Sequence, residues 1–340
     1  MEILVDIYGA DAGIGVAIDG AIQAAKEVES SIKLVGNADT INEYIKENYK
    51  KENVQEISPK LSILQAETFI SNNEEPAMAI KVKKDSSIVV AYNYMKEHEQ
   101  TAFLSAGCTG AVMAGALLKL GRIPGIHRPA LTTIIPTKNG KDVVFLDSGA
   151  NPNAKDLSLL QYALIGKAYS KYVLKKENVK IALLNIGVEE EKGTPDLKEA
   201  YKLLKANVPE FVGNVEARNI VDSGYDVIVC DGLQGNIAIK SLEGAVLTIK
   251  DEIVSIFKRS LINKIKAFFV KDIVKEAFLR YDYREKGGGV LLGVKKPVVK
   301  IHGSSKKLSF FVGIKQADNI LKADIIEHIK ADLAEMKNNN

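Results

Sequence analysis

The sequence Ser105-Ala106-Gly107-Cys108-Thr109-Gly110 is a run of small residues that leads directly into an apolar segment over residues 111–120. The apolar run Ala102-Phe103-Leu104 precedes it, so the pattern predicts a strand, a turn of small residues and then a helix. Such a turn leaves the first N–H groups of the helix unpaired, and together with the helix dipole they favour an anion such as a phosphate. The two glycines permit a close approach of the backbone, and the serine and threonine hydroxyls offer donors. From these residues alone, a tight turn without a ligand is the alternative.

The overall composition is that of a soluble globular protein with a large core. The chain has 340 residues, of which 46% are hydrophobic and 26% are charged. With 46 Lys and Arg against 43 Asp and Glu, the net charge of +3 is too small to indicate a nucleic-acid partner. The two cysteines form no CxxC pair, so we expect no disulfide framework, no zinc site and a cytosolic, reducing compartment. The first residues resemble a strand rather than a signal peptide, and no apolar run approaches the roughly 20 residues of a membrane-spanning helix.

Strand-like and helical segments alternate from the first residues onwards. A buried-strand pattern over residues 3–6 precedes a helical pattern, and a second strand pattern over 32–36 precedes a polar helix over 40–49. Two strand–loop–helix units in succession predict a mostly parallel, doubly wound sheet. The length of the chain fits one large domain or two closely packed ones. Asp6 and Asp11 lie at the end of the first strand, where ligand sites of such sheets gather, and an aspartate that caps the loop is the alternative.

Polar residues and glycines follow several further strand patterns. Residues 130–136 and 143–146 flank an Asn-Gly turn and predict paired strands. The side chains at strand ends that could bind or orient a substrate are Asp147 and Asn151, Asn185 and Lys192, Asn214, Asp231 and Asn236, and His302 and Ser304. Each of them could instead serve its own loop, and a hydrogen-bonded structural histidine is as common as a catalytic one.

Residues 251–283 differ from the rest of the chain. Apolar residues such as Ile253, Phe257 and Phe268 recur there at helical spacing, with lysines between them. Such an amphipathic helical segment packs on a neighbour, or it lies in a membrane interface with its lysines at the headgroups. Ordinary helix packing is the interpretation that the residues alone favour.

A set of short motifs occurs in one order along the chain, and this order resembles a known family. The motifs are Ser105-Ala106-Gly107-Cys108-Thr109-Gly110-Ala111, Gly121-Arg122-Ile123-Pro124-Gly125-Ile126, Leu146-Asp147-Ser148-Gly149-Ala150-Asn151, Leu184-Asn185-Ile186-Gly187, Gly213-Asn214-Val215-Glu216, Cys230-Asp231-Gly232 with Gly235-Asn236, and His302-Gly303-Ser304-Ser305. Each motif alone is weak, but the set is similar to that of the bacterial phosphate acyltransferases of phospholipid synthesis (PlsX type). The resemblance extends from Val5-Asp6 to beyond Ser305.

This resemblance implies an enzyme that transfers a fatty acyl group from acyl carrier protein to inorganic phosphate. The product would be an acyl phosphate, which a downstream glycerol-3-phosphate acyltransferase, a further expected partner, would use. The resemblance also implies a three-layer α/β/α fold in a single domain over residues 1–340, with a sheet related to that of isocitrate dehydrogenases and phosphotransacetylases. It further implies a homodimer and no metal or other cofactor. It implies a cytoplasmic protein that is partly associated with the inner face of the cell membrane. Residues 251–283 would then be a protruding segment that contacts the partner subunit, the membrane, or both.

The expected chemistry is the attack of a phosphate oxygen on a thioester carbonyl, which gives a tetrahedral intermediate with an oxyanion. We expect the phosphate to bind at residues 107–110 with Ser105 and Thr109, and with Lys192 nearby. The amides that could donate to the oxyanion are those of Asn151, Asn185, Asn214 and Asn236. Asp231 or His302 could orient these groups or protonate the departing thiolate.

Two positions depart from the family pattern. The first loop reads Tyr8-Gly9-Ala10-Asp11-Ala12, where the family has Met-Gly-Gly-Asp, and this puts an anion contact from residues 9–11 in doubt. Cys108 stands where Asn or Ser is usual. A thiol at a helix N-terminus becomes more acidic and more nucleophilic, so Cys108 could carry the acyl group as a thioester. The interpretation we favour is that Cys108 replaces a small polar side chain and forms no covalent bond.

Three other functions fit part of the sequence. A phosphotransacetylase-like enzyme would use acyl-CoA or a short-chain thioester. A nicotinamide-dependent decarboxylating dehydrogenase would have a related fold, but no GxGxxG follows the first strand and no carboxylates cluster in a metal-binding pattern. A non-catalytic membrane scaffold would depend on residues 251–283 alone.

Overall fold

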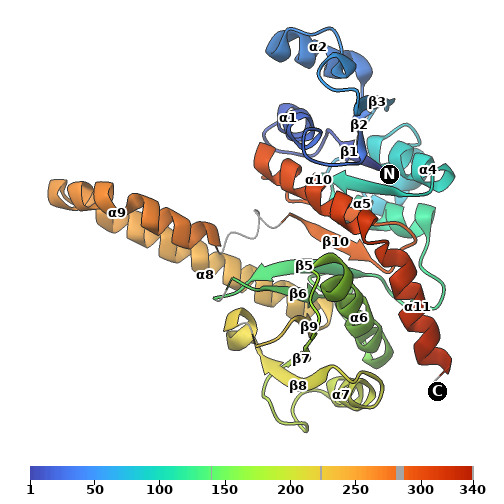
Figure 1. Cartoon of the computed structure of the whole chain (residues 1–340), viewed down its shortest axis with the longest axis vertical. Helices are drawn as coiled ribbons and strands as arrows, with labels where there is room; N and C mark the ends of the chain where they lie inside the picture. Colours follow the sequence, from blue (N-terminus) through green and yellow to red (C-terminus); the bar gives the residue numbers. More distant parts are fainter. Residues whose placement is uncertain (139, 223, 281–286, 339–340) are drawn as a thin grey trace.

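The strands that the structure describes form one sheet with helices on both of its faces (Figure 1). The computed structural model describes residues 1–138, 140–222, 224–280 and 287–338. Within these residues the sheet has 11 strands in the order β3-β2-β1-β4-β11-β10-β5-β6-β9-β7-β8. The predicted α/β architecture, with a sheet between helices, is thereby confirmed.

Strands and helices alternate along most of the chain. The strands are β1 (Glu2–Asp6), β2 (Ser31–Gly36), β3 (Leu61–Gln65), β4 (Thr101–Ser105), β5 (Ala130–Pro136), β6 (Asp142–Leu146), β7 (Ile181–Asn185), β8 (Phe211–Glu216), β9 (Val227–Val229), β10 (Gly289–Leu292) and β11 (Val298–Lys300). The helices are α1 (Gly15–Ala24), α2 (Ala38–Tyr49), α3 (Pro76–Val82), α4 (Ser87–Glu97), α5 (Thr109–Gly115), α6 (Asp156–Ala168), α7 (Pro195–Asn207), α8 (Gly232–Lys258), α9 (Leu261–Arg280), α10 (Lys307–Lys322) and α11 (Ile325–Asn338). Short 3-10 or π segments are η1 (Val54–Glu56), η2 (Ala116–Leu120), η3 (Tyr169–Val173) and η4 (Ala217–Asp222).

The sheet consists of two halves whose strands run in opposite directions. β3, β2, β1, β4 and β11 are parallel to one another, and β6, β9, β7 and β8 form a second parallel set. Between the two sets, β10 is antiparallel to both β11 and β5, and β5 is antiparallel to β6. The mostly parallel sheet and the β5–β6 pairing agree with the prediction, while Asn139 of the predicted turn lies outside the described residues. We call the β11-β10-β5 region, where the direction reverses, the seam.

The central strands of the first half are buried on both faces. Ile3 and Val5 of β1 pack in one apolar cluster with Ile18 of α1 and Phe310 of α10, and Leu4 packs in another cluster with residues of α4. Alternate side chains of a strand point to opposite faces, so a strand that is covered on both sides reads as a continuous apolar run. This is why the run over residues 3–6 predicts a buried strand correctly.

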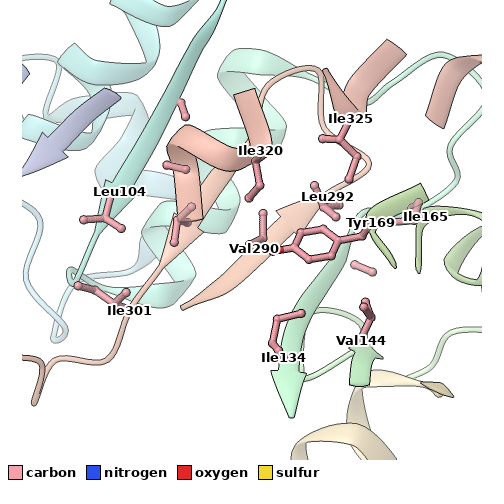
Figure 2. Packing of buried hydrophobic residues seen from close by; sticks show 14 of the residues in the cluster. Leu104, Ile134, Val144, Ile165, Tyr169, Val290, Leu292, Ile301, Ile320 and Ile325 are labelled. Carbon is pink, nitrogen blue, oxygen red and sulfur yellow. The ribbon is translucent and has the colours of Figure 1, made fainter. Parts of the chain in front are cut away.

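One apolar cluster crosses the seam and joins the two halves (Figure 2). Val290 and Leu292 of β10 belong to the same cluster as Leu104 of β4 and Ile134 of β5. The ring of Tyr169, which follows α6, reaches towards Val290 in this view. The two halves therefore share one core.

α8 and α9 form a helical hairpin that projects from the body of the molecule (Figure 1). The predicted segment 251–283 is not one continuous helix, because α8 ends at Lys258 and α9 begins at Leu261. The Ser260 hydroxyl accepts a hydrogen bond from the Asn263 N–H at 3.1 Å and caps α9, while the Asn263 amide donates to the Ile256 carbonyl of α8 at 3.0 Å. Residues 281–283 of the predicted segment lie outside the described residues.

No helix within the described residues combines the length and the apolar character needed to cross a bilayer.

Candidate active site

A cavity of about 290 Å³ lies at the seam of the sheet, and we call it the polar cavity. Its walls come from β5, the first turns of α8, the turns after β4 and β6, and the end of β11. Its polar lining includes Thr109, Thr133, Ser148, Asn236, Lys300 and His302. The structure thus brings together Thr109, Asn236 and His302, which sequence patterns singled out at three separate strand ends.

The turn after β4 (residues 105–110, the β4 turn) has a buried side and an exposed side. The Ser105 hydroxyl is fully buried, donates to Asp6 at 2.7 Å and accepts from the Gly107 N–H at 2.9 Å. Thr109 and Gly110 are exposed where α5 begins, and Cys108 at the N-cap position makes no side-chain cap bond. The first N–H groups of α5 are therefore left for a ligand, whereas Ser105 holds the turn and does not line the cavity.

The loop after β1 is held against the β4 turn. Gly9 has a φ of +87°, and a Cβ at this position would lie 2.3 Å from the Cα of Gly107, so glycine is required there. The Asp11 N–H donates to the Gly303 carbonyl at 2.7 Å. Asp11 and Ser304 are exposed side chains in these joined loops, but neither lines the polar cavity.

A buried acid, Asp6, and a half-buried base, Lys300, lie beneath the β4 turn. Burial raises the pKa of Asp6 to about 6, although the hydrogen bond from Ser105 and the charge of Lys300 act in the opposite direction. Burial lowers the pKa of Lys300 to about 8, while the charge of Asp6 acts to raise it. The Lys300 ammonium donates to the carbonyl of Ala106 at 3.2 Å and to that of Ile301. Because Lys300 also lines the polar cavity, it brings a positive charge to the cavity wall.

The turn after β6 (residues 147–151, the β6 turn) is organised by the Asp147 carboxylate. It accepts from the N–H groups of Leu131, Gly149, Ala150 and Asn151 at 2.7–3.1 Å, and from the Asn151 amide at 2.8 Å. Burial raises the pKa of Asp147, and these hydrogen bonds oppose that shift. Asp147 and Asn151 therefore shape the turn, and the neighbouring Ser148 and Gly149 line the polar cavity.

The start of α8 is packed closely against the β6 turn. Asp231 is the N-cap residue, and its carboxylate accepts from the N–H groups of Leu233 and Gln234 at 2.8 and 2.9 Å. A Cβ on Gly235 would lie 1.9 Å from the Asp147 carbonyl oxygen, so only glycine permits this approach. The result is that Asn236, one residue later, lines the cavity.

The ends of β7 and β8 hold a separate group of predicted residues. The Asn185 amide donates to the Lys192 carbonyl at 3.0 Å, and the Asn214 amide donates to the Glu189 carbonyl at 2.8 Å. Neither these asparagines nor the exposed Lys192 line the polar cavity. The structure does not bring them together with Thr109, and their roles stay predictions.

Both cysteines are buried free thiols. Cys108 packs in an apolar cluster with Ile80 and Tyr92 and does not line the polar cavity, which favours the interpretation that it fills space. The Cys230 thiol donates to the Asp147 carbonyl at 3.4 Å, and burial raises its pKa well above the usual range. Among the described residues, no three His, Cys, Asp or Glu side chains gather so that they could hold a metal ion.

Sequence patterns miss five polar residues of the cavity, which are Thr133, Ser148, Lys240, Glu243 and Lys300. Lys300 stands at a strand end two positions before His302, and this position is the signal that could have found it. Thr133 lies in the middle of β5, and its hydroxyl donates to that of Ser148 at 2.8 Å. Only the antiparallel pairing of β5 with β6 brings these two hydroxyls together, so no local pattern indicates them.

Comparison with known proteins adds to this geometry. The model of a family described as fatty acid synthesis protein (FA_synthesis) matches residues 1–328. The chain belongs to this family. The phosphate acyltransferase of Thermoanaerobacterium thermosaccharolyticum is 42% identical over 333 residues, which cover 98% of this chain and 97% of that protein. The phosphate acyltransferase of Clostridium novyi is 43% identical over 339 residues, with 98% of each chain covered. The resemblance to phosphate acyltransferases is thus confirmed, and as a member of the family the chain is an acyltransferase.

A solved structure of low sequence identity shows the same fold. A phosphotransacetylase from Streptococcus pyogenes superposes with a TM-score of 0.57 at 16% identity, covering 97% of this chain and 94% of that protein. The expected relation of the sheet to that of phosphotransacetylases is therefore confirmed.

Proposed function

We propose that this chain transfers a fatty acyl group from acyl carrier protein to inorganic phosphate and releases an acyl phosphate. The observation that carries the proposal is the polar cavity, whose lining includes Thr109, at the exposed start of α5, and Lys300. N–H donors, a hydroxyl and a positive charge that converge on one space suit a phosphate anion. The match to the fatty acid synthesis family supports an acyl group as the second substrate.

In the proposed reaction, a phosphate oxygen forms a bond to the carbonyl carbon of the thioester, and the C–S bond then breaks. Phosphate is already a nucleophile at neutral pH, so the protein needs mainly to position it and to stabilise charge. We assign the phosphate to the β4 turn, with Thr109 and Lys300 as contacts. We assign Asn236 to the oxyanion and His302 to protonation of the departing thiolate, so that the carrier leaves as a free thiol. Asp147, Asn151 and Asp231 act as positioning residues through the β6 turn and α8.

The identity of the acyl donor distinguishes this proposal from a second candidate function, which is transfer from acyl-CoA or a short-chain thioester. The fold is shared with a phosphotransacetylase, but this likeness concerns the fold alone and does not favour the second candidate. The test measures loss of thioester from palmitoyl-acyl carrier protein, palmitoyl-CoA and acetyl-CoA, each with and without phosphate. We expect phosphate-dependent loss that is fastest with the acyl carrier protein donor. Fastest turnover of acetyl-CoA would support the second candidate, and the absence of any phosphate dependence would contradict both.

We further propose that the α8–α9 hairpin contacts a second copy of the chain and the inner face of the cell membrane. Leu261, Phe268 and Phe269 are 77%, 66% and 75% exposed, and Lys264 and Lys266 are exposed beside them. Exposed apolar side chains with flanking lysines suit the boundary between acyl chains and anionic headgroups. A protein at this surface would release its product near the downstream glycerol-3-phosphate acyltransferase, the further partner that we propose. Light scattering measures the number of copies, and co-sedimentation with anionic vesicles should be lost when Phe268 and Phe269 are both replaced by serine.

A further inference from the structure

A second cavity, of about 390 Å³, runs between α8, α9 and the end of β5. Its lining is mostly apolar, with Leu242, Val246 and Phe257 from α8, Val274 and Phe278 from α9, and Ile135 from β5. We call it the apolar groove. The apolar groove is a different cavity from the polar cavity, but the two are neighbours.

The two cavities meet at three residues. Thr133, Ile239 and Glu243 line both the polar cavity and the apolar groove. The Glu243 side chain is 13% exposed and forms an ion pair with Lys240 at 3.1 Å, so the charged pair stands where the polar wall gives way to the apolar one. A molecule with a polar end and a long apolar tail could therefore lie in both spaces at once.

From this continuity we infer that the apolar groove binds the fatty acyl chain of the donor while its thioester lies in the polar cavity. The inference deepens the proposed function and rests on it for the identity of the polar end. The groove follows α8 from Ile239 to Phe257, a rise of about 27 Å at about 1.5 Å per residue. The hydrocarbon core of a bilayer, which holds two layers of acyl chains, is about 30 Å thick, so one chain needs about 15 Å. The groove therefore has the length for a long acyl chain, and its volume lies in the range of small-molecule sites.

The arrangement of the hairpin explains how a chain could enter. α8 and α9 project from the body (Figure 1). Most residues that line the groove belong to these two helices, so the groove lies along the hairpin rather than inside the sheet. Lys250, Lys271 and Lys275 stand among its lining residues, and each can place its ammonium in water while its apolar stem covers the groove. The acyl chain then lies on the molecular surface under flexible stems, with its reactive end at the seam.

The test narrows the groove and measures chain-length preference. Val246→Trp fills the groove at a distance from the polar cavity, and Ala245→Trp places the same side chain on an exposed neighbouring position of α8 that does not line it. Phosphate-dependent thioester loss is measured for both variants with palmitoyl- and hexanoyl-acyl carrier protein. For V246W we expect kcat/KM to fall about tenfold or more with palmitoyl and less than about threefold with hexanoyl, because about two buried methylene groups correspond to this factor. A245W should change neither value by more than about twofold.

A binding measurement makes the outcome independent of turnover. Fluorescence of cis-parinaric acid, a long-chain fatty acid, reports occupation of the groove in the wild type and both variants, and light scattering reports their oligomeric state. Weaker binding by V246W alone supports the groove even if no donor is turned over, in which case the proposed function fails and the groove stands. The inference would be overturned if V246W lost activity equally with both chain lengths, or if its binding of cis-parinaric acid were unchanged. It would also be overturned if V246W changed the oligomeric state without changing chain-length preference, and that result would assign the groove to a second copy.

Discussion

The β4 turn and the β6 turn have the same local pattern but use their polar groups differently. Both follow strands with buried apolar side chains, and both begin with a polar residue and contain glycine. In the β6 turn, the donors described above all point inward to the Asp147 carboxylate. In the β4 turn, Ser105 points inward to Asp6, but Thr109 and the start of α5 are exposed to the cavity.

This difference separates a residue that shapes a site from one that can contact a ligand. An acceptor that is already saturated by its own loop contributes to stability, because its loss leaves buried donors unpaired. At a helix start without a side-chain cap, water or an anion must satisfy the exposed N–H groups. A hydroxyl at such a position therefore contributes to the binding of a ligand. Substitutions in the two turns should therefore affect different measurements.

The largest effect is expected in the β6 turn. Asp147→Ala should lower the free energy of unfolding by about 3 kcal/mol or more, because it leaves several buried N–H groups without an acceptor. Urea denaturation followed by circular dichroism measures this change, and Asp147→Asn, which keeps one acceptor oxygen, serves as the milder variant. If D147A has the same free energy of unfolding as the wild type but loses activity, the Asp147 carboxylate contacts the substrate. The distinction between the two turns would then be wrong.

The second effect concerns the charge on the cavity wall. Lys300→Met should raise the KM for phosphate by roughly thirtyfold, because it removes the cation that faces the anion, a loss of about 2 kcal/mol. Since the pKa of Lys300 is lowered to about 8, its charge is present below this pH and is lost above it. The KM of the wild type should therefore rise as the pH passes through about 8.

Lys300→Arg is the matched control, because arginine stays protonated throughout this range and should give a KM that does not change near pH 8. Steady-state kinetics at varied phosphate between pH 7 and about 9 provide the measurement. A KM for K300M that equals that of the wild type at every pH would show that Lys300 serves only the buried pair with Asp6.

The smallest effect compares two predicted site residues directly. Thr109→Ala should raise the KM for phosphate about tenfold, the value of one hydrogen bond to a charged group, and Thr109→Ser should restore most of it. Asn185→Ala, whose amide is already bound to the Lys192 carbonyl, should change kcat/KM less than about threefold. A large loss of kcat with N185A and none with T109A would show that Asn185, rather than Thr109, contacts the substrate.

The fold and part of the site follow from local patterns in the sequence. Continuous apolar runs indicate the buried strands. A polar residue with glycine at a strand end indicates Thr109, Asn236 and His302, which the structure places around one cavity. The same pattern also selects Asn185 and Asn214, because strand ends look alike whether their amides face a cavity or a loop carbonyl.

The features that the sequence does not reveal depend on distant contacts. A lysine near a strand end looks solvated, and Lys300 is half-buried because β11 pairs with β4. The apolar periodicity continues across Ser260, so no change of pattern marks the break between α8 and α9. At this break the Ser260 hydroxyl caps α9, and the Asn263 amide donates to the Ile256 carbonyl of α8. β10, from residues 289–292, lies between β11 and β5 and is antiparallel to both, and no local pattern indicates that it inserts there.

The pairing of β10 and β11 also sets the order in which the molecule can form during synthesis. The strands that join the two halves come from residues 289–292 and 298–300, after every other strand of the sheet that the structure describes. Asp318 of α10 then accepts hydrogen bonds from the N–H and hydroxyl of Ser30, at 3.0 and 2.6 Å, across 288 positions of sequence. Until the ribosome has released this last part of the chain, β4 and β5 have open edges that can pair with other chains. The cavity at the seam is thus completed last, and contacts so distant in sequence favour slow folding.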